Sequence, residues 1–144
     1  MIIAIGNDHA GIRMKQSIQK YLVSVGHQVV NVGTDDDHSV DYPDFAKAVS
    51  NEVLKQADFG ILICGTGIGM SIAANKINGI RAALIYDHQT AVLAKQHNNA
   101  NVIAFGARTQ TEEQAIALVK AYVDSSFETR HQTRIDKITK SEDR

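Results

Sequence analysis

The chain has 144 residues, of which 44% are hydrophobic and 22% charged, as expected for a globular domain with a substantial core. With 15 Lys and Arg against 16 Asp and Glu, the net charge is −1, which argues against nucleic acid or an anionic membrane as a partner. No apolar run approaches the roughly 20 residues of a membrane-spanning helix. The start lacks the basic flank of a signal peptide, and the one cysteine cannot form an internal disulfide. We therefore expect one cytoplasmic domain over residues 1–144.

Five short apolar runs alternate with helical patterns along the chain. Strands are expected at residues 2–5, 28–32, 59–63, 82–85 and 102–105. Helices are expected over about 11–26, from Asp44, from Ser71, over about 87–96 and from Thr111, and a short one in the charged tail from Phe127. Such alternation predicts a three-layer α/β/α sandwich with a Rossmann-like, doubly wound, five-stranded parallel sheet.

The stretch over residues 59–76 combines a buried strand, a glycine loop and the opening of a helix. Glycines let backbone N–H groups approach a ligand, and a helix N-terminus adds positive partial charge, so this arrangement favours an anion. Cys64 lies where strand and loop meet. We expect it to act as a base or nucleophile, with the loop stabilising the charge it creates. A tight turn beside a buried, inert thiol is the alternative, and the glycine spacing fits neither the Walker A nor the dinucleotide pattern.

Ligands of doubly wound folds bind beyond the carboxyl ends of the strands. Residues 7–11 and 106–108 follow predicted strands there, as the glycine loop does. Asp8 either caps the next helix or binds sugar hydroxyls, and His9 could bind a phosphate. His97 lies in a polar loop that leads from a helix into a strand, so the topology alone does not place it at that edge, although a neighbouring subunit could bring it there. As a neutral imidazole near pH 7 it could transfer a proton.

Two further groups of charged residues attract attention in the sequence. Arg130 and Arg134 are four residues apart, so a helical tail would present both on one face, where guanidinium groups grip phosphate well or simply remain exposed. Arg108 could join them. Residues 35–38 (DDDH) do not have the spacing of a zinc site, so we predict no metal, and we assign no role to the acidic loop at 35–39.

With these residues in view, the chain resembles the ribose-5-phosphate isomerase B family from residue 3 to about residue 138. Six stretches carry the resemblance in the same order. They are residues 7–11 (NDHAG), 41–43 (DYP), 60–76 (GILICGTGIGMSIAANK), 79–82 (GIRA), 97–102 (HNNANV) and 130–134 (RHQTR).

The resemblance implies a cytoplasmic enzyme that interconverts ribose 5-phosphate and ribulose 5-phosphate through an enediolate, without metal or cofactor. It also implies a homodimer, sometimes paired into a tetramer, whose active sites are shared between subunits and whose tail, about residues 127–144, packs on the partner. Matching the motifs gives each site residue a role. Cys64 would be the base, His97 would open the sugar ring, and the anion loop would comprise Gly65, Thr66, Gly67, Ile68 and Gly69. The substrate would contact Asp8, His9, Tyr42 and Asn98, and the phosphate would be held by His9, Arg108, Arg130 and Arg134.

One departure and two alternatives accompany this expectation. Family members usually carry Glu-Gly-Gly before the Arg-His of the tail, whereas here Glu128-Thr129 is one residue shorter, which leaves the placement of Arg130 open. A six-carbon aldose phosphate, such as allose 6-phosphate or galactose 6-phosphate, is the nearest alternative substrate. A non-catalytic module that binds phosphate or nucleotide is the alternative from another class.

Overall fold

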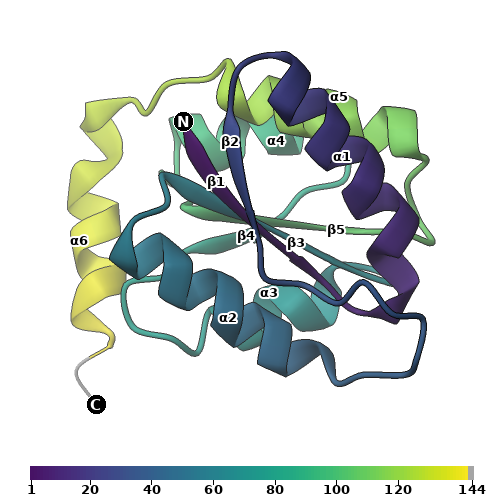
Figure 1. Cartoon of the computed structure of the whole chain (residues 1–144). Coiled ribbons are helices and arrows are strands. Elements are labelled where there is room, and N and C mark those ends of the chain that lie inside the picture. Colours follow the sequence, from purple (N-terminus) through teal and green to yellow (C-terminus); the bar gives the residue numbers. More distant parts are fainter. Residues whose placement is uncertain (143–144) are drawn as a thin grey trace.

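The computed structural model describes residues 1–142. Its elements, in chain order, are β1 (Ile2–Asn7), η1 (His9–Gly11), α1 (Ile12–Ser24), β2 (Gln28–Asn31), α2 (Tyr42–Lys55), β3 (Phe59–Cys64), α3 (Ile68–Ala74), β4 (Ala82–Leu84), α4 (His88–Gln96), β5 (Val102–Gly106), α5 (Glu112–Val123), η2 (Thr129–His131) and α6 (Gln132–Lys140). All strand pairs are parallel, in the order β2-β1-β3-β5-β4. The predicted three-layer sandwich is thus confirmed, with α1, α4 and α5 over one face and α2 and α3 over the other (Figure 1).

The central strand β3 contributes side chains to the helix layers on both faces of the sheet. All six of its residues are buried, and alternate side chains serve opposite faces. Ile61 and Ile63 pack with α1 and α5, whereas Leu62 and Cys64 pack with α2 and α3. The chain places β2 on one side of β1 and then returns to place β3 on the other side, so the strand order reverses between β1 and β3. Their carboxyl ends therefore form the crevice in which such folds bind ligands.

The bounds predicted for the elements up to the start of α5 lie within three residues of the observed ones. Helix α2 begins at Tyr42, two residues before the expected Asp44, because Pro43 is well suited to the first turn of a helix. Helix α3 begins at Ile68, not at Ser71. The end of α1 follows the sequence closely, since Gly26 has a positive φ of 93°. The short tail helix is present as α6, and residues 143–144 of the predicted tail lie outside the described part of the chain.

Candidate active site

Cys64 is the last residue of β3, and 5% of its surface is exposed. The backbone N–H of Gly67 donates a hydrogen bond to its Sγ at 3.1 Å. The loop therefore directs a main-chain N–H dipole at the sulfur. Cys64 belongs to the same buried cluster as Met70 of α3, so little of the thiol faces water.

The loop that follows Cys64 needs glycine for two physical reasons. Gly67 has φ 81°, and a Cβ atom there would lie 2.7 Å from the Cα of Phe105. Thr66 forms a turn, because its Oγ1 accepts a hydrogen bond from the N–H of Ile68 at 3.2 Å. Its hydroxyl proton remains available for donation. Since α3 starts at Ile68, the sequence-based boundary at Ser71 is wrong, and Ile68 and Gly69 belong to the helix's first turn, where N–H groups point outward.

Two predicted substrate residues lie against this loop. The ring of Tyr42, at the start of α2, is so close to Gly69 that a Cβ atom on that glycine would lie 2.5 Å from the tyrosine Cζ. Arg108 follows β5, and its N–H donates to the carbonyl of Gly65 at 2.9 Å. A Cβ atom on Gly65 would lie 2.6 Å from the Nη1 of Arg108. An aromatic ring and a guanidinium group therefore flank the two ends of the loop.

The end of β1 supplies the other wall. Asp8 donates its N–H to the carbonyl of Ile63 at 3.0 Å, and its Oδ1 accepts from the N–H of Ala10 at 2.9 Å. Asp8 is thus a capping residue as expected, but it caps the turn η1, whereas the N-cap of α1 is Gly11. His9 Nδ1 accepts a hydrogen bond from the N–H of Val40 at 3.2 Å, so the ring proton is on Nε2. We call Asp8, His9, Tyr42, residues 64–69 and Arg108 the carboxyl-edge cluster.

His97 lies at the opposite edge of the sheet. It caps the end of α4, and the loop after it is bound to the start of β3, where the carbonyl of Asn101 accepts from the N–H of Gly60 at 2.9 Å. Cys64 is four residues further along that strand, or about 13 Å at roughly 3.3 Å per residue. The structure therefore does not bring His97 and Cys64 together within one chain.

The tail lies at this edge, on the side where β1 begins (Figure 1). A pocket of about 320 Å³ forms there. Its lining residues are His97, Asn98, Arg130, His131, Arg134, Ile135 and Ile138. Arg130 belongs to η2 and not to a continuous α-helix, contrary to the sequence-based expectation, yet both arginines line the pocket. We call His97, Asn98, Arg130 and Arg134 the amino-edge cluster.

The family to which the chain belongs indicates which reaction the two clusters could catalyse. The family model described as Ribose/Galactose Isomerase matches residues 3–138. The chain belongs to the ribose/galactose isomerase family. Ribose-5-phosphate isomerase B of Escherichia coli K12 is 44% identical over 144 residues, covering 99% of this chain and 97% of that protein. The family resemblance seen in the sequence is thereby confirmed.

Two solved structures extend the comparison. Ribose-5-phosphate isomerase B of Clostridium thermocellum matches with a TM-score of 0.96 at 42% identity, covering 99% of this chain and 97% of that one. The enzyme of Mycoplasma genitalium, solved with bound ribulose 5-phosphate, matches with a TM-score of 0.93 at 43% identity, covering 98% and 95%. The agreement extends over the whole domain and includes both edges of the sheet.

Within this family member, His131 is a residue that our sequence analysis did not single out. Its ring centroid lies 4.4 Å from that of His97, and its Nδ1 lies 3.1 Å from the Nη1 of Arg134. Burial, together with the charges of Arg130, His97 and Arg134, lowers the pKa of His131, and Glu128 opposes this only in part. The neutral ring thus links a predicted proton donor to a predicted phosphate ligand. Its position between the two arginines of the matched tail motif was the available signal.

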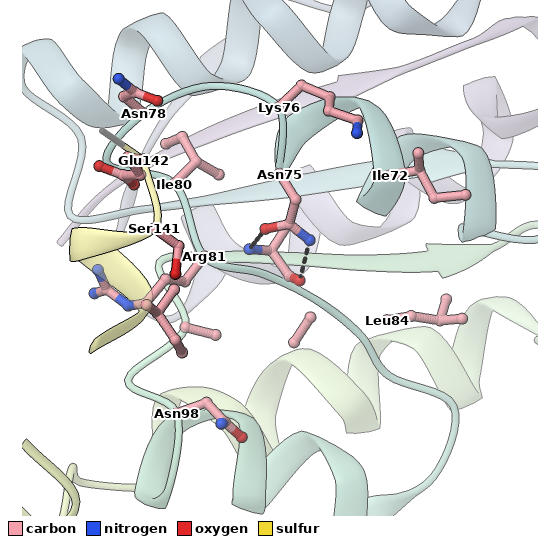
Figure 2. Close-up of a pocket in the computed structure, with 14 residues that line it drawn as sticks. Ile72, Asn75, Lys76, Asn78, Ile80, Arg81, Leu84, Asn98, Ser141 and Glu142 are labelled. Atoms are coloured by element: carbon pink, nitrogen blue, oxygen red, sulfur yellow. Dashed lines mark hydrogen bonds between the residues drawn. The ribbon is translucent and has the colours of Figure 1, made fainter. Parts of the chain in front are cut away.

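A larger pocket of about 920 Å³ lies beside the edge strand β4 (Figure 2). The side chain of Asn75 bonds both the N–H and the carbonyl of Ala82, at 2.8 and 2.9 Å, and so occupies part of that strand's free edge. Ile72 and Ile138, both exposed, line it from α3 and α6. Of the predicted site residues, all of which the structure describes, Asn98 alone lines this pocket.

Three possible metal ligands lie close together in the acidic loop. The ligand atoms of Asp36, Asp37 and His38 lie within 4.8 Å of one another, but all three residues are exposed. His38 donates its N–H to Asp36 at 2.8 Å, and its ring contacts the same carboxylate, so the loop satisfies itself. That the site needs no metal stays a prediction.

None of the helices in residues 1–142 is long and apolar enough to cross a membrane.

Proposed function

We propose that this family member interconverts ribose 5-phosphate and ribulose 5-phosphate by proton transfer between C1 and C2. The observation that carries the proposal is the thiol of Cys64, which accepts a hydrogen bond from the N–H of Gly67 at the rim of the sheet. Asp8 is bonded to the preceding residue, Ile63, and Tyr42 lies against Gly69 of the same loop. The names of the relatives support the substrate, and one of them was solved with bound ribulose 5-phosphate. We also propose that the enzyme works in the cytoplasm.

The proposed chemistry starts from the open-chain aldehyde. The thiolate of Cys64 removes the proton on C2, and the carbonyl electrons move onto O1 to give an enediolate. The backbone N–H groups of residues 65–69 and the hydroxyl of Thr66 stabilise that negative charge, because they are already oriented toward it. The sulfur returns the proton to C1 while the O2 proton passes to O1, which leaves a ketone at C2. A positioned base of this kind must lie within reach of the carbon.

Ring opening and phosphate binding fall to the other residues. His97 protonates the ring oxygen of the closed sugar, and Asp8 interacts with the sugar hydroxyls. Asn98 contacts the sugar beside His97. The phosphate lies among guanidinium groups, which bind phosphate oxygens in pairs, and the Nε2–H of His9 donates to it. Binding energy from this remote group holds the reacting carbons at the sulfur.

A complete site in this proposal requires two copies of the chain. The carboxyl-edge cluster of one copy holds the base, and the amino-edge cluster of a second copy brings His97, Asn98, Arg130 and Arg134 to it. The support is the separation of the two clusters by the length of β3. The exposed apolar residues Ile72 and Ile138 around the larger pocket give a homodimer apolar surface to bury. Dimers could pair further into tetramers.

A six-carbon substrate is the second candidate, because the family description names galactose isomerases as well. The distance between the phosphate ligands and Cys64 determines which sugar fits. A competition assay between ribose 5-phosphate and allose 6-phosphate or galactose 6-phosphate separates the two proposals. Preferential turnover of a six-carbon sugar would replace the pentose assignment.

The primary test incubates the purified protein with ribose 5-phosphate and follows ketose formation, with and without a chelator. We expect turnover that the chelator leaves unchanged. Binding without turnover would instead support a non-catalytic phosphate-binding module, and loss of turnover with the chelator would overturn the metal-free proposal.

A further inference from the structure

Lys15 on α1 is fully buried, although lysine is among the residues that are least often buried. An ammonium group removed from water is costly unless it is paired and hydrogen-bonded. Its Nζ donates to the carbonyl of Thr34 and to Oδ1 of Asp35, each at 2.6 Å. Both acceptors belong to residues 32–41, which we call the β2–α2 loop. This loop contains the acidic stretch to which the sequence analysis assigned no role.

Asp35 reaches the buried lysine from the surface, where 68% of its side chain is exposed. Its carboxylate also accepts from the Nδ2 of Asn31, at 3.2 and 3.3 Å. The hydrogen bonds from Lys15 and then Asn31 hold the pKa of Asp35 below its ordinary value, so the carboxylate is charged near neutral pH. One side chain of the loop is therefore bound to α1 and to the end of β2 together.

The other attachments of the loop lead directly to the carboxyl-edge cluster. Thr34 donates its N–H to the carbonyl of Asn7 at 3.4 Å, and the Nδ2 of Asn7 donates to the carbonyl of Thr34 at 3.1 Å. Gly33 lies so close to Asn7 that a Cβ atom on the glycine would collide with the amide oxygen Oδ1. At its far end the loop gives the N–H of Val40 to His9. The loop thus has two anchored ends, one at Lys15 and one at His9.

We propose that Lys15 and Asp35 are a positioning pair that sets the tautomer of His9. By fixing the β2–α2 loop, the pair keeps the N–H of Val40 on Nδ1 of His9, which places the ring proton on Nε2, the nitrogen left to donate to an anion. The identity of that anion as the phosphate of a sugar phosphate rests on the proposed function, whereas the tautomer does not. Neither Lys15 nor Asp35 touches the substrate in this proposal.

The test replaces Asp35 by Asn, which preserves shape and removes the charge that pairs with Lys15. Asp37→Asn, two residues further along the same loop and exposed, is the matched control for lost charge. We expect Asp35→Asn to raise the KM for ribose 5-phosphate about five- to tenfold, as for one weakened hydrogen bond, with kcat within about twofold. Asp37→Asn should match the wild type, and Asp35→Glu should restore much of the KM. Equal kinetics for Asp35→Asn and Asp37→Asn would overturn the proposal.

Two further measurements separate positioning from general loosening of the fold. In a His9→Ala background, Asp35→Asn should have no further effect on KM, because the pair acts through that ring. Independent effects of the two substitutions would count against the proposal. Nitrogen NMR of His9 should show the Nε2–H tautomer in the wild type and a mixture in Asp35→Asn. An unchanged tautomer would overturn the proposal, and since this signal needs no substrate, it remains decisive if the protein fails to isomerise ribose 5-phosphate.

Discussion

The two clusters of the proposed site are built from different kinds of structure. The carboxyl-edge cluster lies at the ends of the buried strands β1, β3 and β5, where the backbone N–H groups of the loop meet the side chains of Asp8, Cys64 and Arg108. The amino-edge cluster consists of side chains that meet where the tail rests on α4. There the N–H of Glu128 donates to the carbonyl of Gln96 at 2.9 Å, and Ile135 is buried. The first cluster is therefore attached to the strands of the core, and the second depends on how the tail docks.

This difference predicts a division of labour. Preorganised main-chain donors act best on charge that develops during the reaction, so changes at the carboxyl edge should lower kcat. Side-chain cations that bind a remote phosphate act alike on substrate and transition state, so changes at the amino edge should mainly raise KM. His97 is the exception at the amino edge, because we assign it a chemical step. His9 and Arg108 are the exceptions at the carboxyl edge, because we assign them to the phosphate.

The largest effect is expected from Cys64→Ala at the carboxyl edge. Removing a positioned base typically costs about 10²- to 10⁴-fold in rate, so kcat should fall by that factor. Substrate should still bind, which calorimetry with ribose 5-phosphate can measure. Ser71→Ala, in α3 beyond the loop, is the control for small changes near this helix. Near-normal turnover of Cys64→Ala would mean that the base lies elsewhere.

Mixing inactive variants tests whether the two clusters come from different copies. Cys64→Ala damages only the carboxyl edge, and His97→Asn damages only the amino edge. Random reassociation of a symmetric dimer would give half mixed dimers, each with one intact site, so activity should return to about a quarter of the wild-type value. Each variant alone, treated in the same way, is the control. No recovery after verified subunit exchange would contradict a shared site.

The carboxyl-edge cluster could be predicted from the sequence because topology determines it. Parallel strands bring their carboxyl ends to one edge, so Asp8, Cys64 and Arg108 were expected at the same edge once five strands were recognised. Their closeness follows from the order β1-β3-β5, which the structure shows and the sequence did not predict. The start of α3 could not be predicted well, since Ile68 and Gly69 are compatible with a loop as well as with a first helical turn. Their helical geometry depends on Gly67 adopting a positive φ against β5.

The arrangement of the amino-edge cluster could be predicted less well from the sequence. The spacing of Arg130 and Arg134 suggested one helical face, yet Arg130 lies in η2, and it is the docking of the tail on α4 that unites them. His131 and Lys15 were missed for a common reason. Each owes its role to burial against a partner distant in sequence, and no local pattern reports that.

His97→Asn should separate ring opening from proton transfer. Turnover of ribose 5-phosphate, which is mostly closed, should fall by about 10²-fold or more, as for loss of a general acid. An open-chain analogue such as erythrose 4-phosphate should be affected much less. Equal loss with both substrates would refute the ring-opening role. His88→Asn, which makes the same exchange at an exposed histidine of α4, provides the control.

Arg134→Ala should show the binding character of the amino edge. Losing a charge-assisted hydrogen bond should raise KM about 10- to 100-fold, with a much smaller change in kcat. Arg13→Ala, which removes an exposed arginine from α1, is the matched control and should leave both constants unchanged. A fall in kcat as large as the rise in KM would show that this guanidinium group also stabilises the transition state.

The smallest effect concerns the pH dependence of stability at the amino edge. His131 has a pKa lowered from its ordinary value of 6.5, because burial and then Arg130, His97 and Arg134 disfavour its charged form, with Glu128 opposing them. The unfolded chain therefore binds a proton more readily than the folded one. The stabilising contribution of the neutral ring is complete above about pH 6.5 and is lost as pH falls from there through the folded pKa. The melting temperature of the wild type should thus fall between about pH 7.5 and 5.5, and less so in His131→Gln, with His88→Gln as control. If the melting temperature changed with pH equally in the wild type and both variants, the His131 ring would have the same pKa in the folded and the unfolded chain. The tail would then not bury this ring against His97 firmly enough to hold the amino-edge cluster in place.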